Sequence, residues 1–197
     1  MSGLPIVVSG PSGVGKGTLI NKICENMPQL EVSISTTTRE PRPGEKNGES
    51  YFFVSKEEFE QKIEAGFFLE WAKVYDQYYG TSREFVEKVT EKGNNILLEL
   101  DVQGAIQVKE SISSAVLIFI APPSLWELRR RITSRGTEKP EHIEKRMEIA
   151  WQELRMYIEY DYVVINEIIE ETVSKIYAII TAEEHRVSRN PEVWWNK

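Results

Sequence analysis

The sequence contains little cysteine and histidine, which limits the chemistry that it can support. Among 197 residues there is one cysteine, Cys24, and there are two histidines, His142 and His185. A single cysteine excludes an internal disulfide and any multi-cysteine metal site, and its position beside Ile20 and Ile23 in a helical pattern predicts a packing role. The two histidines lie far apart in charged helical segments, so we expect them at the surface and not in a metal site.

Long apolar runs and an excess of positive charge are also missing. The sequence has no run of about eighteen apolar residues and no basic, apolar leader, so we expect a cytoplasmic protein that does not bind a membrane. The formal net charge of −7 gives no general attraction for nucleic acid polymers. An anionic ligand must therefore be held by local groups, which favours a small anion.

A glycine-rich segment near the N-terminus is the most informative motif. Residues 9–18 read Ser-Gly-Pro-Ser-Gly-Val-Gly-Lys-Gly-Thr, after a short apolar run and before a helix-like stretch. The spacing G-x-x-x-x-G-K after a strand is typical of a loop whose backbone N–H groups surround a phosphate at a helix N-terminus, with Lys16 reaching the outer phosphates. Gly17 stands where this pattern has Ser or Thr, and Thr18 is the next hydroxyl. The alternative is an ordinary glycine-rich turn.

Apolar runs rich in β-forming residues recur along the chain, with helical periodicity between or after most of them. They cover Ile6–Val8, Ile96–Leu100, Val116–Ile120 and Tyr162–Ile165. Near-continuous apolar strands alternating with helices predict an α/β fold in which helices flank a parallel sheet. Ligands bind such sheets beyond the C-terminal ends of the strands, where the glycine-rich segment also lies.

The segment between the first helix and Ile96 has a different pattern. Tyr51–Val54 and Phe67–Val74 are typical of strands, and Ser55 begins a capping box. We therefore expect an α+β insert over about residues 35–81.

A second departure follows the third core strand. Ser124 begins another capping box and an arginine-rich helix, and Pro140 begins a long helix. An apolar stripe on that helix contains Ile143, Met147, Ala150, Trp151 and Leu154. Two helices around a loop predict a lid over about residues 124–159. The single domain would then have a core of about residues 1–34, 82–123 and 160–190, with a last helix over about residues 170–187.

Charged residues gather beside these predicted segments. Arg39 and Arg42 lie in a polar, proline-containing stretch, and further arginines flank the lid. Guanidinium groups bind phosphate oxygens in bidentate fashion, although each cluster alone is also compatible with a solvated surface. Glu99 and Asp101 follow a predicted strand, where carboxylates can serve Mg²⁺ or accept hydrogen bonds from a base. For Asp101 the alternative is to cap the following helix.

Together these segments closely resemble guanylate kinases, the nucleoside monophosphate kinases that phosphorylate GMP. The resemblance extends from Ile6 to about Arg186, and its specificity comes from many motifs in one order. The motifs are Ser9–Lys16, Ser35–Arg42, Gly48–Tyr51, Glu70–Ala72, Tyr78–Thr81, Leu100–Gly104, Ile120–Ser124 and Arg135–Glu138.

The resemblance implies the P-loop nucleoside monophosphate kinase fold and transfer of the γ-phosphoryl group of ATP to GMP or dGMP, with Mg²⁺ as cofactor. The implied GMP site consists of Ser35, Arg39, Arg42, Tyr51, Glu70, Tyr79, Thr81 and Asp101. The implied ATP site consists of Gly10, Pro11, Ser12, Gly13, Val14, Gly15, Lys16, Gly17, Thr18 and Asn166. The implied catalytic charges are Lys16, Arg39, Arg131, Arg135 and Arg146. Thr18 and Glu99 would face the metal, directly or through water.

Two features depart from the family pattern, and two other functions stay open. Gly17 replaces the common Ser, and Glu99 stands where many relatives have Asp. A catalytically inactive phosphopeptide-binding module with this fold is one alternative, which the intact glycine-rich loop disfavours. A kinase for another nucleoside monophosphate is the other, which Glu70 and Asp101 disfavour because carboxylates accept the N–H donors of guanine. We expect a monomer or a homodimer.

Overall fold

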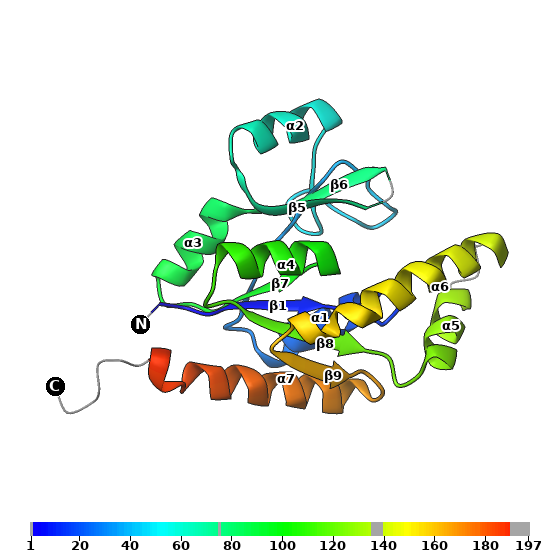
Figure 1. The fold of residues 1–197 in the computed structure, drawn as a ribbon. Helices are drawn as coiled ribbons and strands as arrows, with labels where there is room; N and C mark the ends of the chain where they lie inside the picture. Colours follow the sequence, from blue (N-terminus) through cyan, green and yellow to red (C-terminus); the bar gives the residue numbers. More distant parts are fainter. Residues whose placement is uncertain (1, 75, 135–139, 190–197) are drawn as a thin grey trace, which may run out of the picture.

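A parallel sheet forms the centre of the molecule (Figure 1). The computed structural model describes residues 2–74, 76–134 and 140–189. The sheet contains β1 (Pro5–Ser9), β2 (Glu31–Val32), β7 (Ile96–Glu99), β8 (Val116–Ala121) and β9 (Tyr162–Ile165), in the order β2-β7-β1-β8-β9. Every pairing in it is parallel. The four predicted strands and the predicted α/β class are confirmed, whereas the two-residue strand β2 is too short to leave a periodic signal.

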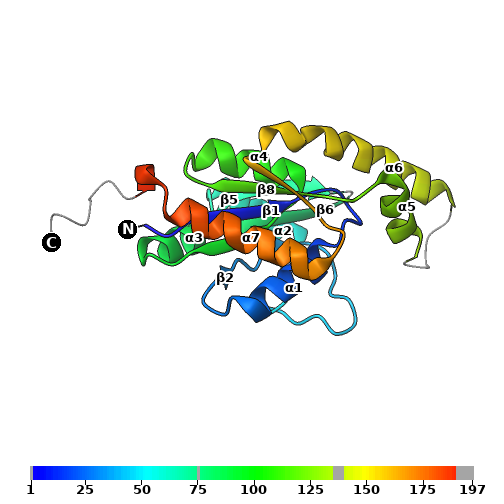
Figure 2. The same ribbon diagram turned by 90° about the horizontal axis from the view of Figure 1, so that it is seen from below.

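Helices cover both faces of this sheet. On one face, α1 (Lys16–Asn26) and α7 (Ile169–Glu184) pack against Ile6 and Val8 of β1. On the other, α3 (Arg83–Glu91) and α4 (Val102–Ser111) pack against Val7. Figure 1 shows α4 above the sheet and α7 below it, and Figure 2, seen from below, shows α7 in front of the strands. Burial on both faces explains why β1, β7 and β8 are apolar without alternation, whereas the edge strand β9 leaves Val163 and Ile165 exposed.

The predicted insert forms a second sheet above the first (Figure 1). Its strands are β3 (Thr36–Thr37), β4 (Phe52–Phe53), β5 (Phe68–Val74) and β6 (Gln77–Ser82), in the order β4-β3-β6-β5, and its helix is α2 (Lys56–Glu64). The β3–β4 pair is parallel and the other two pairs are antiparallel. The capping box at Ser55 is confirmed, since Ser55 and Glu58 exchange hydrogen bonds of 2.9 and 3.1 Å. The sequence did not predict β3 and β6.

The two expected lid helices are α5 (Leu125–Thr133) and α6 (Pro140–Arg155), and a short 3₁₀ helix, Met156–Glu159, follows them. Ser124 caps α5 by accepting the Glu127 N–H at 3.1 Å. The Glu127 carboxylate, however, pairs with Arg130 and Arg131 at 2.7 Å instead of turning back to the cap. Only half of the second predicted capping box therefore forms.

The apolar stripe of α6 packs on α5, with one exception. Ile143, Met147, Ala150 and Leu154 lie against the buried side chains of α5. Trp151 was expected in this stripe, but its side chain is 48% exposed. It lies at the edge of the stripe, beyond the narrow face that the nine-residue helix α5 covers, and its ring instead lies 5.8 Å from the Arg155 guanidinium.

Several smaller expectations can be compared with the structure. The last helix ends at Glu184, earlier than predicted, and a 3₁₀ turn, Val187–Arg189, follows. Cys24 is a partly buried free thiol against the core, and His142 and His185 are exposed, as predicted. Among the described residues, no helix combines the length and apolar character needed to cross a bilayer.

Candidate active site

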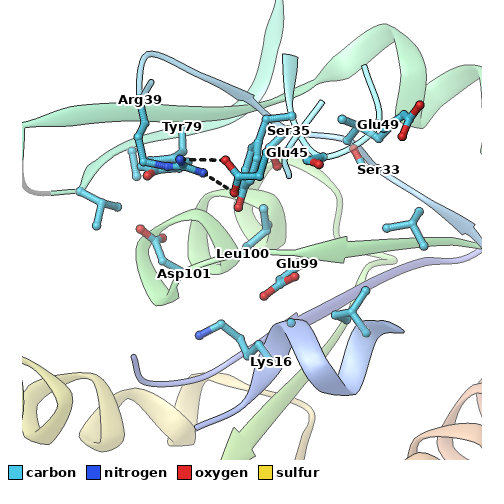
Figure 3. A pocket seen from close by; sticks show the side chains of 18 of the residues that line it. Lys16, Ser33, Ser35, Arg39, Glu45, Glu49, Tyr79, Glu99, Leu100 and Asp101 are labelled. Atoms are coloured by element: carbon cyan, nitrogen blue, oxygen red, sulfur yellow. Dashed lines mark hydrogen bonds and ion pairs between the residues drawn. The ribbon is translucent and has the colours of Figure 1, made fainter. Parts of the chain in front are cut away.

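A cavity of about 680 Å³ lies between the C-terminal edge of the core sheet and the insert. Seven of the eight residues predicted to bind GMP border it: Ser35, Arg39, Arg42, Tyr51, Glu70, Tyr79 and Asp101. Of the ten residues predicted to bind ATP, Lys16 and Gly17 border it and the other eight do not, and Glu99, predicted for the metal, borders it as well. Figure 3 shows Lys16 and Arg39 on opposite sides of this pocket, with Glu99 and Asp101 between them. Residues from the first 20 and from position 101 thus meet at one site because parallel strands end at the same edge.

The glycine-rich loop has the geometry expected of an anion cradle. Gly15 caps α1 in the left-handed region, with φ 99°, where a side chain would be strained. Lys16 Nζ donates to the carbonyl oxygen of Gly10 and, at 3.4 Å, to that of Pro11. The loop therefore directs the N-terminus of α1 and the charge of Lys16 toward the cavity.

Asn166 supports this loop from beneath. It is 7% exposed, and its Nδ2 donates to the Val14 carbonyl at 2.9 Å. Thr172 in turn donates to Asn166 Oδ1 at 3.2 Å. The amide thus fixes the backbone of the loop, and the contact with ATP that the resemblance implied for it stays a prediction.

The two residues proposed for the metal differ in placement. Glu99 borders the cavity with its side chain exposed there, and desolvation by the surrounding protein raises its pKa while Lys16 opposes the shift. Thr18 is exposed and is not among the residues that border the cavity. No group of three His, Cys, Asp or Glu side chains suited to a metal occurs in the part of the chain that the structure describes.

One end of the cavity contains two neighbouring carboxylates. Glu70 is 4% exposed, and burial, with a smaller contribution from the negative Asp101, raises its pKa to about 7, whereas Thr81 acts in the opposite direction. Asp101 caps α4, since the Gly104 N–H donates to Asp101 Oδ1 at 2.7 Å. The capping role that the sequence left open for Asp101 is therefore confirmed, and its carboxylate also borders the cavity. Thr81, the partner of Glu70 in the pairing of β5 with β6, is fully buried and does not border the cavity.

The other end of the cavity contains the arginines of the insert. Both terminal nitrogens of Arg39 donate to Glu45 at 2.9 Å, and the Arg42 N–H donates to the same carboxylate at 2.7 Å. These hydrogen bonds hold the pKa of Glu45 below its usual value. The Arg39 guanidinium also lies 5.3 Å from the Tyr51 ring centre. Sequence reasoning missed Glu45, although the turn-forming residues between Arg39 and Glu45 were a signal that the two could meet.

The lid helices contact the glycine-rich loop and do not border the cavity. Arg131 donates to the Val14 carbonyl at 3.1 Å, and Arg146 donates to Ser12 Oγ at 2.8 Å. The Ser12 N–H donates to Glu153 at 3.2 Å, a contact that no sequence pattern indicated. Arg135, also predicted to be catalytic, lies outside the described residues.

A phosphate loop, opposing arginines and paired carboxylates around one cavity match a known family. A family model described as guanylate kinase matches residues 2–183. The chain belongs to the guanylate kinase family. The guanylate kinase of Caldanaerobacter subterraneus subsp. tengcongensis is 55% identical over 192 residues, which cover 98% of this chain and 93% of that relative. The guanylate kinase of Clostridioides difficile is 48% identical over 187 residues, covering 95% and 91%.

Solved structures agree with this assignment. The crystal structure of guanylate kinase from Anaplasma phagocytophilum matches with a TM-score of 0.81 at 39% identity, covering 95% of this chain and 89% of that one. The SH3-kinase fragment of tight junction protein 3 shares the fold only, with a TM-score of 0.51 at 13% identity. The predicted family, the P-loop nucleoside monophosphate kinase fold and the predicted enzyme class, an ATP-dependent kinase, are confirmed. Guanylate kinase relatives at this identity do not support the inactive-module alternative.

Proposed function

We propose that the chain transfers the γ-phosphoryl group of ATP to GMP, giving ADP and GDP, and that it also accepts dGMP. The observation that carries the proposal is one cavity in which Lys16 lies opposite Arg39 and Arg42, with Glu70 and Asp101 at its buried end. Such a cavity suits two anionic nucleotides whose phosphates must meet.

Glu70 and Asp101 would select the base. Guanine presents N–H donors at N1 and N2, and carboxylates accept such donors well. Adenine has an acceptor at N1, which would leave a buried carboxylate without a hydrogen bond. Ser35, which borders the same cavity, and Thr81, the strand partner of Glu70, would complete this recognition.

Lys16 and the arginines would align the phosphates and offset their repulsion. A phosphate monoester loses its second proton with a pKa of about 6, so the acceptor oxygen of GMP is largely ionised at neutral pH and needs no strong general base. Arg39, Arg42, Tyr51 and Tyr79 would hold the GMP phosphate. Lys16 and the loop amides would hold the phosphates of ATP for in-line transfer, which depends mainly on positioning and charge.

The residues present fit a hydrated Mg²⁺. Glu99 offers a carboxylate at the cavity wall near Lys16, and Mg²⁺ typically uses one or two carboxylates, retaining waters and phosphate oxygens as its other ligands. We assign Glu99 to this contact through water and give Thr18 a lesser part because its side chain lies off the cavity wall. A bound Mg²⁺ would neutralise charge on the transferring phosphoryl group.

Closure of the insert and the lid would exclude water, which competes with GMP as an acceptor. The insert would cover about residues 35–81 and the lid about residues 124–159. Arg131, Arg135 and Arg146 would then act from the lid. Fast ATP hydrolysis without GMP would contradict this part of the proposal.

The decisive experiment is a coupled assay of diphosphate formation with GMP, dGMP, AMP, CMP and UMP as acceptors. We expect turnover with GMP and dGMP, and GMP to exceed AMP by a large factor. Lys16→Ala should lower the rate by at least about a hundredfold while leaving the unfolding transition in place. Near-normal turnover in that variant would exclude the role assigned to Lys16, and equal turnover of AMP and GMP would exclude the selectivity proposed.

A further inference from the structure

The first turn of α4 carries a glycine whose missing side chain is occupied by another residue. A Cβ built on Gly104 would lie 2.5 Å from Glu70 Oε2, 3.2 Å from Glu70 Cδ and 3.4 Å from Asp101 Oδ1. The first of these distances is far below van der Waals contact. The Glu70 carboxylate therefore fills the volume that any other residue at position 104 would need.

We propose that Gly104 is a positioning residue for purine recognition, because its missing side chain lets the Glu70 carboxylate lie beside that of Asp101. The inference rests on the proposed function, in which these two carboxylates bind guanine. Gly104 does not border the cavity and would not touch the base. Its role would be to leave space for the Glu70 carboxylate, which would contact the base.

The strand that carries Glu70 is fixed to α4 and cannot move away from a larger residue. Gln107, one turn beyond Gly104, accepts the Trp71 N–H at 3.2 Å and donates to the Trp71 carbonyl at 2.8 Å. Leu69, on the other side of Glu70, packs in the core against Ala105 and Val108. The backbone of β5 is therefore held on both sides of Glu70. A larger residue at position 104 would then displace the Glu70 side chain and not the strand.

A bulge in β5 directs Glu70 to this position. The pairing of β5 with β6 shifts between Phe68 and Glu70. Glu70, Ala72 and Val74 border the cavity, as the alternation of a strand requires, whereas Phe68 packs on the Phe59 ring with 4.4 Å between ring centres. The extra residue in the bulge thus lets β5 direct Phe68 into the aromatic core of the insert and Glu70 toward Asp101.

The test is Gly104→Ala, with Gln103→Ala as a matched control at an exposed position of the same helix. We expect Gly104→Ala to raise KM for GMP about tenfold or more and to reduce the preference for GMP over IMP, which lacks the 2-amino group. KM for ATP should stay unchanged. The control should change none of these values.

A second background separates this role from general damage to the helix. Alanine normally stabilises a helix relative to glycine, but beside Glu70 it should lower the midpoint of urea unfolding. In a Glu70→Ala background the carboxylate is gone, so Gly104→Ala should raise the midpoint. If Gly104→Ala fails to fold, recovery of folding in the double variant supports the contact, and failure to recover overturns it.

The outcomes distinguish this inference from the proposed function. Absence of diphosphate formation from GMP by the parent enzyme would overturn the proposed function and the purine role of Gly104 with it. Normal parent activity together with an unchanged KM for GMP in Gly104→Ala would overturn this inference alone. The same sign of the stability change in both backgrounds would also overturn it.

Discussion

The two ends of the cavity hold charge in opposite ways. At the end where we propose that the base binds, Glu70 is 4% exposed and makes no ion pair among the described residues, and the one charged group that shifts its pKa is the like-charged Asp101. At the end where we propose that the GMP phosphate binds, Arg39 is paired in bidentate fashion with Glu45. The side chains of this pair are 14% and 22% exposed.

Because of this difference, we expect the two ends to contribute to ligand binding in different ways. Thr81 offsets the burial of Glu70 only in part, so a ligand that supplies further N–H donors should be favoured at this end and a ligand without them disfavoured. Arg39 already has an anionic partner in Glu45. A phosphate that replaces Glu45 therefore gains only the difference between its own interaction with Arg39 and that of Glu45. Base selectivity should therefore depend on a preformed, energetically costly site, and phosphate binding on exchange of partners.

The largest effect is expected at the phosphate end. Arg39→Ala should lower kcat/KM by about 10²–10³-fold, because it removes a bidentate donor from the phosphate that receives the new group. The loss should be the same for GMP and IMP, since the base is not involved. Arg39→Lys, which keeps the charge but not the planar fork, should recover only part of the activity. If Arg39→Ala lowered kcat/KM for GMP but not for IMP, Arg39 would act on the base as well, which would contradict the separate roles proposed for the two ends of the cavity.

A smaller, base-dependent effect is expected from Glu70→Gln. The amide is similar in shape but places a donor where guanine also donates, so KM for GMP should rise about 10–100-fold, with a smaller change for IMP. Glu49→Gln is the control, because Glu49 borders the same cavity with an exposed side chain. Equal losses with both acceptors would remove the base-selective role of Glu70.

The same substitution should stabilise the protein at high pH. The folded pKa of Glu70, about 7, lies above its ordinary value of 4.5, so the folded state favours the protonated acid. The resulting stability is fully present below about pH 4.5 and is lost as the pH rises through about 7. Glutamine resembles the protonated acid at every pH. Glu70→Gln should therefore exceed the parent by about 3 kcal/mol in free energy of unfolding at pH 8, and by little near pH 4.5.

Urea unfolding of both proteins at the two pH values measures this difference. A parent that matches the variant at pH 8 would mean that Glu70 is not strained by burial. The contrast between the ends would then disappear, because neither end would carry an uncompensated charge.

The smallest effect is expected from Glu45→Gln. Removing the negative partner of Arg39 should lower KM by about two- to fivefold for every acceptor, because the incoming phosphate no longer displaces an ion. Arg39 remains in place through its ring contacts with Tyr51 and Phe53. Measurement of KM for GMP and for IMP at two salt concentrations would test for this decrease in KM. A rise in KM would show instead that Glu45 orders Arg39 for phosphate.

The core of the fold could be predicted from sequence because its signals are local and strong. Four strands are apolar on both faces, and the glycine-rich loop has a fixed spacing, so both are visible without coordinates. The strands β3 and β6 were missed because polar residues dominate them, and because β3 is only two residues long and pairs with residues 52–53 and 79–80. Their conformation is set by tertiary contacts and not by intrinsic preference.

The composition of the site could be predicted better than its contacts. Motifs placed Arg39, Glu70 and Asp101 at one site, and the cavity brings them together. They could not show that Glu45 pairs with Arg39 or that a bulge redirects Glu70, because both depend on backbone geometry that a residue pattern does not encode. The exposed Trp151 has a similar cause, since helical spacing does not reveal how wide a face the partner helix covers.

One serine joins two distant parts of the molecule. The hydroxyl of Ser12 receives a hydrogen bond from Arg146, and its backbone N–H donates to Glu153. Both partners lie on α6, two turns apart on the helix and more than 130 residues away along the chain. A rotation of α6 would therefore shift the backbone of the glycine-rich loop at Ser12. The geometry with which this loop would hold a phosphate would then depend on the orientation of α6.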